Sequence, residues 1–191
     1  MLEQIFKEIE KLKDPERAKH SLRYFKTGPG EYGAGDKFLG LNNPQMRALA
    51  KKYKNLDIGD IATLLKSGFH EERQIALFIL VHQFEGGDAD VKTRIYNFYL
   101  KNTKYINNWD LVDLSAHKIV GAYLVDKEKL ILYKLVKSKD LWEKRIAVIS
   151  TFWFIINDSF EDALKIAEIL LEDKHDLIHK AVGWMLREIG K

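Results

Sequence analysis

The segment LVKSKDLWEKRIA, residues 135–147, decides the fold because it ends one helical pattern and leads into another. Apolar residues at helical spacing run from Leu130 to Val136 and stop at the polar pair that follows. After a short connection, Arg145, Ile146 and Ala147 belong to a second pattern of the same period. The segment therefore predicts two helices joined by a short loop.

Three other segments align with this one, and they cover residues 64–76, 100–111 and 170–182. The equivalent residues Gln74, Trp109, Arg145 and Lys180 are separated by 35, 36 and 35 positions. A nearly constant period of this length is typical of two-helix HEAT-type repeats. The sequence thus predicts an all-α fold, a solenoid of HEAT-like two-helix repeats with a concave binding face, in one domain over residues 1–191. An ordinary helical bundle is the alternative.

The distribution of proline supports a helical chain, since the three prolines all precede residue 45. Asp14-Pro15 and Asn43-Pro44 each look like a helix cap followed by the first helical residue. No segment shows the sustained period-two alternation of a β-strand. We expect ten or eleven helices.

Composition excludes several classes of protein. There are 31 Lys and Arg against 28 Asp and Glu, a net charge of +3, which rules out a histone-like polycation. The absence of cysteine excludes a disulfide scaffold, a Cys-ligated zinc site and a thiol nucleophile. The charged N-terminus lacks the apolar core of a signal peptide, and the run 146–157 is too short to cross a bilayer. We expect a cytoplasmic protein without a membrane partner.

The repeat register predicts where a site lies, because equivalent positions of stacked repeats line up. One row contains Trp109, Arg145 and Lys180, and a second row one turn further on contains Asp113 and Trp184. Together they gather two tryptophans, a carboxylate and two cations on one surface.

Each residue also has a simpler interpretation. Asp113 lies among apolar neighbours, where an unpaired carboxylate is costly, and it could pair with His117 or Lys118 at the surface. Arg145 could pair with Asp113 or contact a phosphate. Neither choice is fixed by the sequence.

Four stretches carry a family resemblance: DKFLGL at 36–41, YINNWDLVD at 105–113, WEKR at 142–145 and HKAVGWMLR at 179–187. They resemble the AlkD-type DNA alkylation-repair glycosylases, which are built from HEAT-like repeats, over roughly residues 20–190. The resemblance implies excision of cationic alkylated purines, such as N3-methyladenine and N7-methylguanine, from double-stranded DNA without flipping the base into a pocket.

The resemblance also implies roles for single residues. Trp109 and Trp184 would pack against the deoxyribose, and Asp113 would be the catalytic carboxylate. Arg145 would hold a phosphate near the lesion. Lys180 and Arg187 are expected on the same DNA-binding surface, and Tyr24 is our choice for the family's N-terminal aromatic contact.

Two features depart from the founding members of the family. A glycine-rich insert at about residues 27–40 interrupts the N-terminal helices, and it could be a structural turn or a loop that approaches DNA. The second departure is that the chain stops soon after Trp184. We expect a monomer that needs no metal and no organic cofactor. A module that binds distorted or branched DNA without cleaving it is the main alternative function, and a protein scaffold is the third.

Overall fold

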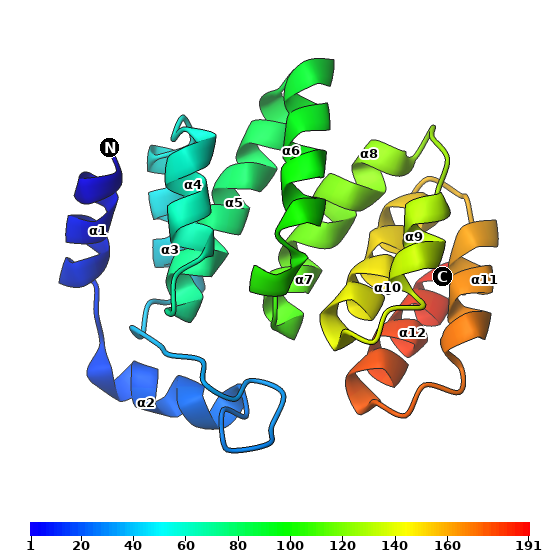
Figure 1. The fold of residues 1–191 in the computed structure, drawn as a ribbon, viewed down its shortest axis with the longest axis horizontal. Coiled ribbons are helices and arrows are strands. Elements are labelled where there is room, and N and C mark those ends of the chain that lie inside the picture. The colour runs from blue at the N-terminus through cyan, green and yellow to red at the C-terminus, as the bar shows by residue number, and fades with distance from the viewer. The chain divides into compact units, whose positions relative to one another are not determined.

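The computed structural model describes residues 1–191, and these residues form helices with no strand longer than one isolated bridge between Lys37 and Phe69. The predicted all-α class is confirmed. Eleven helices are present when α7 and α8 are counted as one, because a π-helical turn joins them without a break. The chain divides into two compact units, residues 1–86 and 87–191, which are described separately (Figure 1).

Unit 1 contains α1 (Leu2–Lys11), α2 (Pro15–Tyr24), α3 (Asn43–Lys52), α4 (Ile58–Leu65) and α5 (His70–Gly86). Helices α3 and α4 both pack against α5. All residues of α5 from His70 to Val81 are buried, so this helix is surrounded by its neighbours on every side. It forms the core of unit 1.

The two proline caps have different outcomes. Asp14 caps α2 as predicted, since its carboxylate accepts the backbone N–H of Arg17 and Pro15 is the first helical residue. The cap of α3 is shifted by one residue, and Asn42 rather than Asn43 holds it. The reason is a reciprocal pair in which the Asn42 side chain accepts the N–H of Gln45 and the Gln45 side chain accepts that of Asn42.

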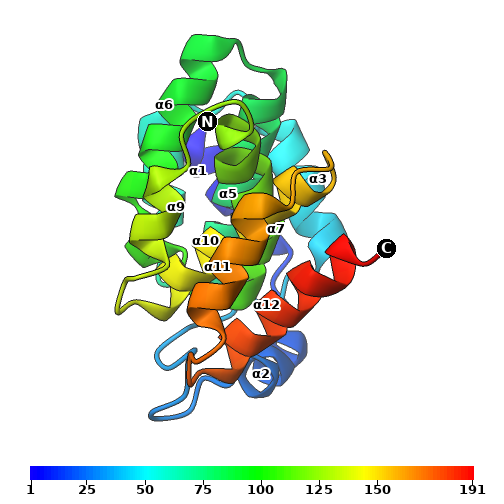
Figure 2. The ribbon, with the colours of Figure 1, turned by 90° about the vertical axis from the view of Figure 1, so that its right-hand side faces the viewer.

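Unit 2 contains α6 (Ala89–Lys101), the short turn η1 (Thr103–Tyr105), α7 (Trp109–Ala116), the π-helical turn η2 (His117–Gly121) and α8 (Ala122–Leu124). It continues with α9 (Leu130–Leu135), α10 (Leu141–Ile155), α11 (Glu161–Leu170) and α12 (Asp176–Ile189). Helix α10 is central, because α7, α9, α11 and α12 all pack against it. Figure 2 shows α11 and α12 side by side in front of it.

The four aligned segments do contain the predicted helix–loop–helix boundaries. The first helix ends at Leu65, Lys101, Leu135 and Leu170, and the second begins at His70, Trp109, Leu141 and Asp176. Three of the second helices begin four residues before the aligned position, whereas α7 begins on that position, at Trp109. The turn η1 and the non-helical residues 106–108 precede α7, and Trp109 is the first residue of its helix rather than the fifth.

The second half of the glycine-rich insert is hydrogen-bonded to α5 of the same unit. The backbone N–H groups of Leu39 and Gly40 donate to the buried carboxylate of Glu71, and the Asp36 carboxylate accepts a hydrogen bond from Arg73 at 2.7 Å. Gly40 has a φ of +86°, and a Cβ there would lie 2.0 Å from the carbonyl oxygen of Asp14. These contacts favour the structural turn of the two interpretations of the insert.

Candidate functional site

Helix α7 positions the first two predicted site residues. Asn108 caps this helix, and its side-chain oxygen accepts the backbone N–H of Trp109 at 2.8 Å. Trp109 and Asp113 are four residues apart and lie on one face, and both are half-buried. The opposite face of α7 is held in the core by Ser115, whose hydroxyl is 2.9 Å from the hydroxyl of the fully buried Tyr99.

The carboxylate of Asp113 is bound by Arg145 of α10 through two parallel hydrogen bonds. Arg145 Nε donates to Asp113 Oδ1 at 2.9 Å, and Arg145 Nη2 donates to Oδ2 at 2.8 Å. This is the bidentate geometry in which guanidinium and carboxylate pair most strongly. Of the partners considered for Asp113, the structure therefore brings Arg145 to it.

Arg145 also joins this pair to α12. Its Nη1 donates to the carbonyl oxygen of Leu177 at 2.5 Å, in the first turn of that helix. The side chain of Arg145 is 6% exposed, against 20% for Asp113. One guanidinium thus links three helices of unit 2, while the carboxylate remains the more accessible partner.

A close approach of backbones explains why α7 and α10 lie near enough for this pair. A Cβ at Gly121 would lie 2.2 Å from the carbonyl oxygen of Ser150, so only glycine fits where η2 meets α10. The π-helical turn that contains Gly121 directly follows α7. Turns of this kind are frequent at functional sites.

Burial and pairing act on Asp113 in opposite directions. Removal from water raises the pKa of Asp113, and the adjacent Arg145 guanidinium lowers it, with burial the larger effect. The net pKa of Asp113 lies above the ordinary value of an aspartic acid. The nearby Asp110 adds to the rise by repulsion between like charges.

Trp184 lies on α12 within an aromatic row that the sequence did not reveal. Its ring is 5.7 Å from that of Phe152 on α10, which in turn is 5.4 Å from the ring of His117. The indole N–H of Trp184 donates to Glu188 at 3.1 Å. Phe152 follows Arg145 by seven residues and His117 follows Asp113 by four, so helical spacing from the predicted residues could have found both.

The predicted cations are placed differently from one another. Arg145 is buried, whereas Lys180 and Arg187 are exposed on α12, and Lys180 forms an ion pair with Asp176 at 3.0 Å. Lys180 and Arg187 flank Trp184 at spacings of four and three residues. They share its side of the helix, although neither contacts Asp113 through a hydrogen bond or ion pair.

Tyr24, the last residue of α2, lies in unit 1, and its side chain is 59% exposed. Its ring meets that of Phe25 edge-on at 5.0 Å. In the same unit, Gln74 and Phe78 are equivalent by repeat to Trp109 and Asp113, but both are buried. At these two repeat positions, the tryptophan and the carboxylate of the candidate site therefore both lie in unit 2.

No group of three or more His, Asp and Glu side chains is arranged to hold a metal ion. No helix combines the length and the apolar character required to span a bilayer.

These features define an all-helical protein in which a paired carboxylate lies one turn from a tryptophan at the start of its helix. The family model described as "DNA alkylation repair enzyme" matches residues 5–191. The chain belongs to this family.

One solved structure similar to this chain is described as a predicted DNA alkylation repair enzyme from Enterococcus faecalis. The two are 17% identical in sequence and superpose with a TM-score of 0.67, over 93% of this chain and 83% of that one. At this identity the likeness supports the fold. No curated protein matches the sequence.

Proposed function

We propose that this protein is a monofunctional DNA glycosylase that excises cationic alkylated purines, including N3-methyladenine and N7-methylguanine, from duplex DNA. The observation that carries the proposal is the Asp113–Arg145 pair, one turn from Trp109, in a member of the DNA alkylation repair family. The proposed enzyme is a cytoplasmic monomer that uses neither metal nor cofactor and leaves the base stacked.

The proposed reaction is hydrolysis of the bond between C1′ of the deoxyribose and the purine nitrogen. The electron pair of this bond leaves with the base, which departs neutral because the alkylated purine already carries a positive charge. The sugar passes through an oxocarbenium-like state, as in other glycoside cleavages. A water molecule then bonds to C1′ and releases a proton, so the products are free base and an abasic sugar.

Asp113 stabilises the positive charge that develops on the sugar. A carboxylate has about four acceptor positions, and Arg145 uses two of them, so acceptor capacity remains for a water molecule. Because the guanidinium balances the carboxylate at rest, the resting site is neutral and does not repel a phosphate. The preorganised charge acts where the transition state becomes cationic.

The tryptophans provide indole faces for the polarised sugar, a contact worth about 0.5–2 kcal/mol for each ring. We assign this role to Trp109 and Trp184. Lys180 and Arg187 supply phosphate contacts beside Trp184, and Tyr24 supplies an aromatic contact from unit 1. We assign Arg145 first to the orientation of Asp113, since three of its N–H groups are already used.

The test is to incubate the protein with duplex DNA that contains N7-methylguanine and to detect free base by chromatography and mass spectrometry. Release above the spontaneous rate supports the glycosylase. Binding of the duplex without release would replace it with a DNA-binding module, and the absence of both would leave a protein scaffold.

A further inference from the structure

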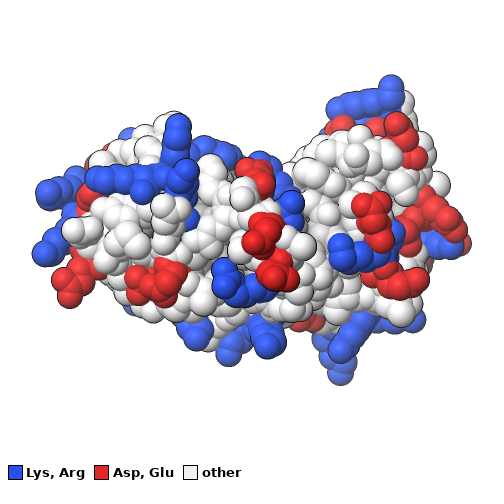
Figure 3. Space-filling model, turned by 90° about the horizontal axis from the view of Figure 1, so that it is seen from above, with Lys and Arg blue, Asp and Glu red and all other residues white.

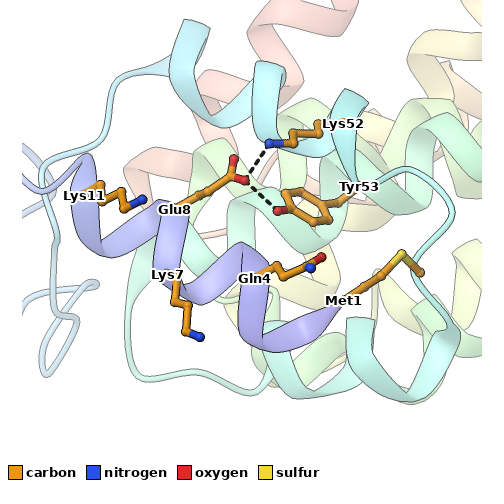
Figure 4. A pocket seen from close by; sticks show the side chains of 7 residues that line it. All are labelled: Met1, Gln4, Lys7, Glu8, Lys11, Lys52 and Tyr53. Atoms are coloured by element: carbon orange, nitrogen blue, oxygen red, sulfur yellow. Dashed lines mark hydrogen bonds and ion pairs between the residues drawn. The ribbon is translucent and has the colours of Figure 1, made fainter.

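A pocket on unit 1 lies apart from every residue assigned so far. It has a volume of about 420 Å³ and is formed by α1 together with the end of α3. Figure 4 shows Glu8 between Lys11 of α1 and Lys52 of α3, with Gln4 and Tyr53 beside them. The lining is mixed polar and apolar, and its side chains include three ammonium groups but a single carboxylate.

The carboxylate of this pocket is already neutralised. Glu8 Oε1 accepts from Lys52 Nζ at 2.5 Å and from the Tyr53 hydroxyl at 2.8 Å. These two bonds lower the pKa of Glu8, and Lys11 contributes through its charge. Glu8 is thus paired directly with Lys52, and it acts on Lys11 only through its charge.

Lys7 and Lys11 lie four residues apart, so their side chains share one face of α1. Neither forms an ion pair, whereas Lys13, which follows α1, is paired with Glu10. Like charges at this spacing repel each other, although Glu3 lies four residues before Lys7 and Glu8 lies three residues before Lys11. Both ammonium groups are exposed and without an ion pair, so they are available to an anion.

Helix α3 adds further positive charge next to the pocket. Its ten residues include Arg47, Lys51 and Lys52 and no acidic residue. Seen from above, basic side chains lie at the N-terminal end of unit 1 with acidic side chains beside them (Figure 3). The surface around the pocket carries charges of both signs, since Glu3 and Glu10 are exposed on α1, and the cations of the pocket without an ion pair are Lys7 and Lys11.

We propose that this pocket binds a backbone phosphate of duplex DNA through Lys7 and Lys11, as a contact area distinct from the Asp113 site. The inference relies on the proposed function only for the identity of the polyanion. Ammonium groups are compact point charges, which suit single phosphate oxygens and do not read bases. The contact therefore adds affinity that depends on salt and not on sequence or lesion.

The test uses undamaged duplex DNA and the full chain, with affinity measured by fluorescence anisotropy between 50 and 200 mM salt. The double variant Lys7→Gln/Lys11→Gln is expected to lower the salt slope by about 0.9, the value for one lost phosphate contact. The control is Lys19→Gln/Lys66→Gln, which removes the same charge from two exposed lysines elsewhere on unit 1. Equal slopes for the two double variants would overturn the proposal.

A variant that removes a negative charge from the same pocket separates the loss of a phosphate contact from damage to the fold. Glu8→Gln keeps an acceptor for Tyr53 and removes the negative charge, so DNA binding should become tighter. Thermal unfolding by circular dichroism should show little change for Lys7→Gln/Lys11→Gln, because both lysines are exposed and neither forms an ion pair. Weaker binding by Glu8→Gln with an unchanged melting temperature would contradict the proposal.

A third measurement distinguishes a DNA phosphate from a free anion. Inorganic phosphate is titrated into the protein, and the amide NMR shifts of α1 are followed. If these shifts change on phosphate addition while the salt slope of DNA binding is the same for wild type and Lys7→Gln/Lys11→Gln, the pocket binds small anions and the DNA assignment is overturned. None of these readouts requires excision. Failure of the glycosylase assay together with a reduced slope would therefore remove the proposed function and keep this contact.

Discussion

Arg145 binds both carboxylate oxygens of Asp113 while a third N–H of the same guanidinium binds the carbonyl oxygen of Leu177. The carboxylate of α7 is thereby fixed relative to α10 and α12, the helix that carries Trp184. Removing one member of a buried pair of this kind costs about 3–5 kcal/mol, and the 20% exposure of Asp113 places the cost toward the lower end.

A conservative variant tests the orienting role of Arg145. Arg145→Lys retains the positive charge but loses the planar fork, so it cannot hold both oxygens of Asp113 and the Leu177 carbonyl together. We expect single-turnover excision to fall about tenfold while the affinity for DNA and its salt slope are unchanged.

The matched control for this variant is Arg17→Lys in unit 1, where Arg17 donates to the Gly40 carbonyl. It should leave excision as it is. A reduced salt slope for Arg145→Lys would show instead that the guanidinium contacts a phosphate.

The raised pKa of Asp113 predicts how excision depends on pH. Only the ionised carboxylate stabilises a cationic sugar, so the rate should fall as the pH drops through the pKa of Asp113 in the folded protein. This limb should lie above the ordinary aspartate value of about 3.9. Rates measured on a lesion that is stable to acid would show it, and a limb at or below that value would contradict the assignment.

The raised pKa of Asp113 also makes the free energy of unfolding depend on pH. The folded protein binds the Asp113 proton more tightly than the unfolded chain, so this group favours folding at low pH. Its contribution declines as the pH rises from the unfolded pKa through the folded one. The measurement is the free energy of unfolding of wild type and of Asp113→Asn across that window. The value for wild type minus the value for Asp113→Asn should decrease as the pH increases.

Much of this arrangement is contained in the sequence, because regular spacing reports which helix faces meet. The positions of Trp109, Arg145 and Lys180 in the repeat predicted that α7, α10 and α12 present equivalent faces, and Asp113 one turn on was placed within reach of Arg145. The predicted end of the first helix at the polar pair after Val136 agrees with the structure, in which α9 ends at Leu135.

Other features depend on contacts without a sequence signature. The choice between Asn42 and Asn43 as the cap of α3 was settled by the Gln45 side chain. The Leu177 carbonyl that binds Arg145 is backbone, and any residue could supply it. The late start of α7, which comes after η1 and the non-helical residues 106–108, is not revealed by the repeat spacing of 35 or 36 residues.

Trp184 offers a test of the aromatic contact with the sugar. Trp184→Ala should lower the excision rate about tenfold, which corresponds to about 1.4 kcal/mol and lies within the range for an indole face. Trp184→Phe keeps an aromatic face against Phe152 and should retain most of the activity. Wild-type rates for both variants would remove Trp184 from the site.

Gly40 tests the structural role of the insert. In Gly40→Ala the new Cβ meets the Asp14 carbonyl in a backbone conformation that favours glycine, so we expect a loss of more than about 1 kcal/mol in unfolding free energy by urea titration. Gly30→Ala is the control, because Gly30 also has a positive φ but no atom within 4 Å of the added methyl. Its loss should be smaller, and an equal loss would mean that backbone strain alone acts at Gly40.

The central claim is that Asp113 promotes cleavage of the glycosidic bond, and one comparison tests it directly. Wild type, Asp113→Asn and the exposed control Asp90→Asn are each mixed in excess with a duplex containing N7-methylguanine, and free base is measured over time. We predict about a hundredfold slower release by Asp113→Asn, with DNA affinity unchanged and Asp90→Asn equal to wild type. Equal release by wild type and Asp113→Asn would contradict the catalytic role of this carboxylate.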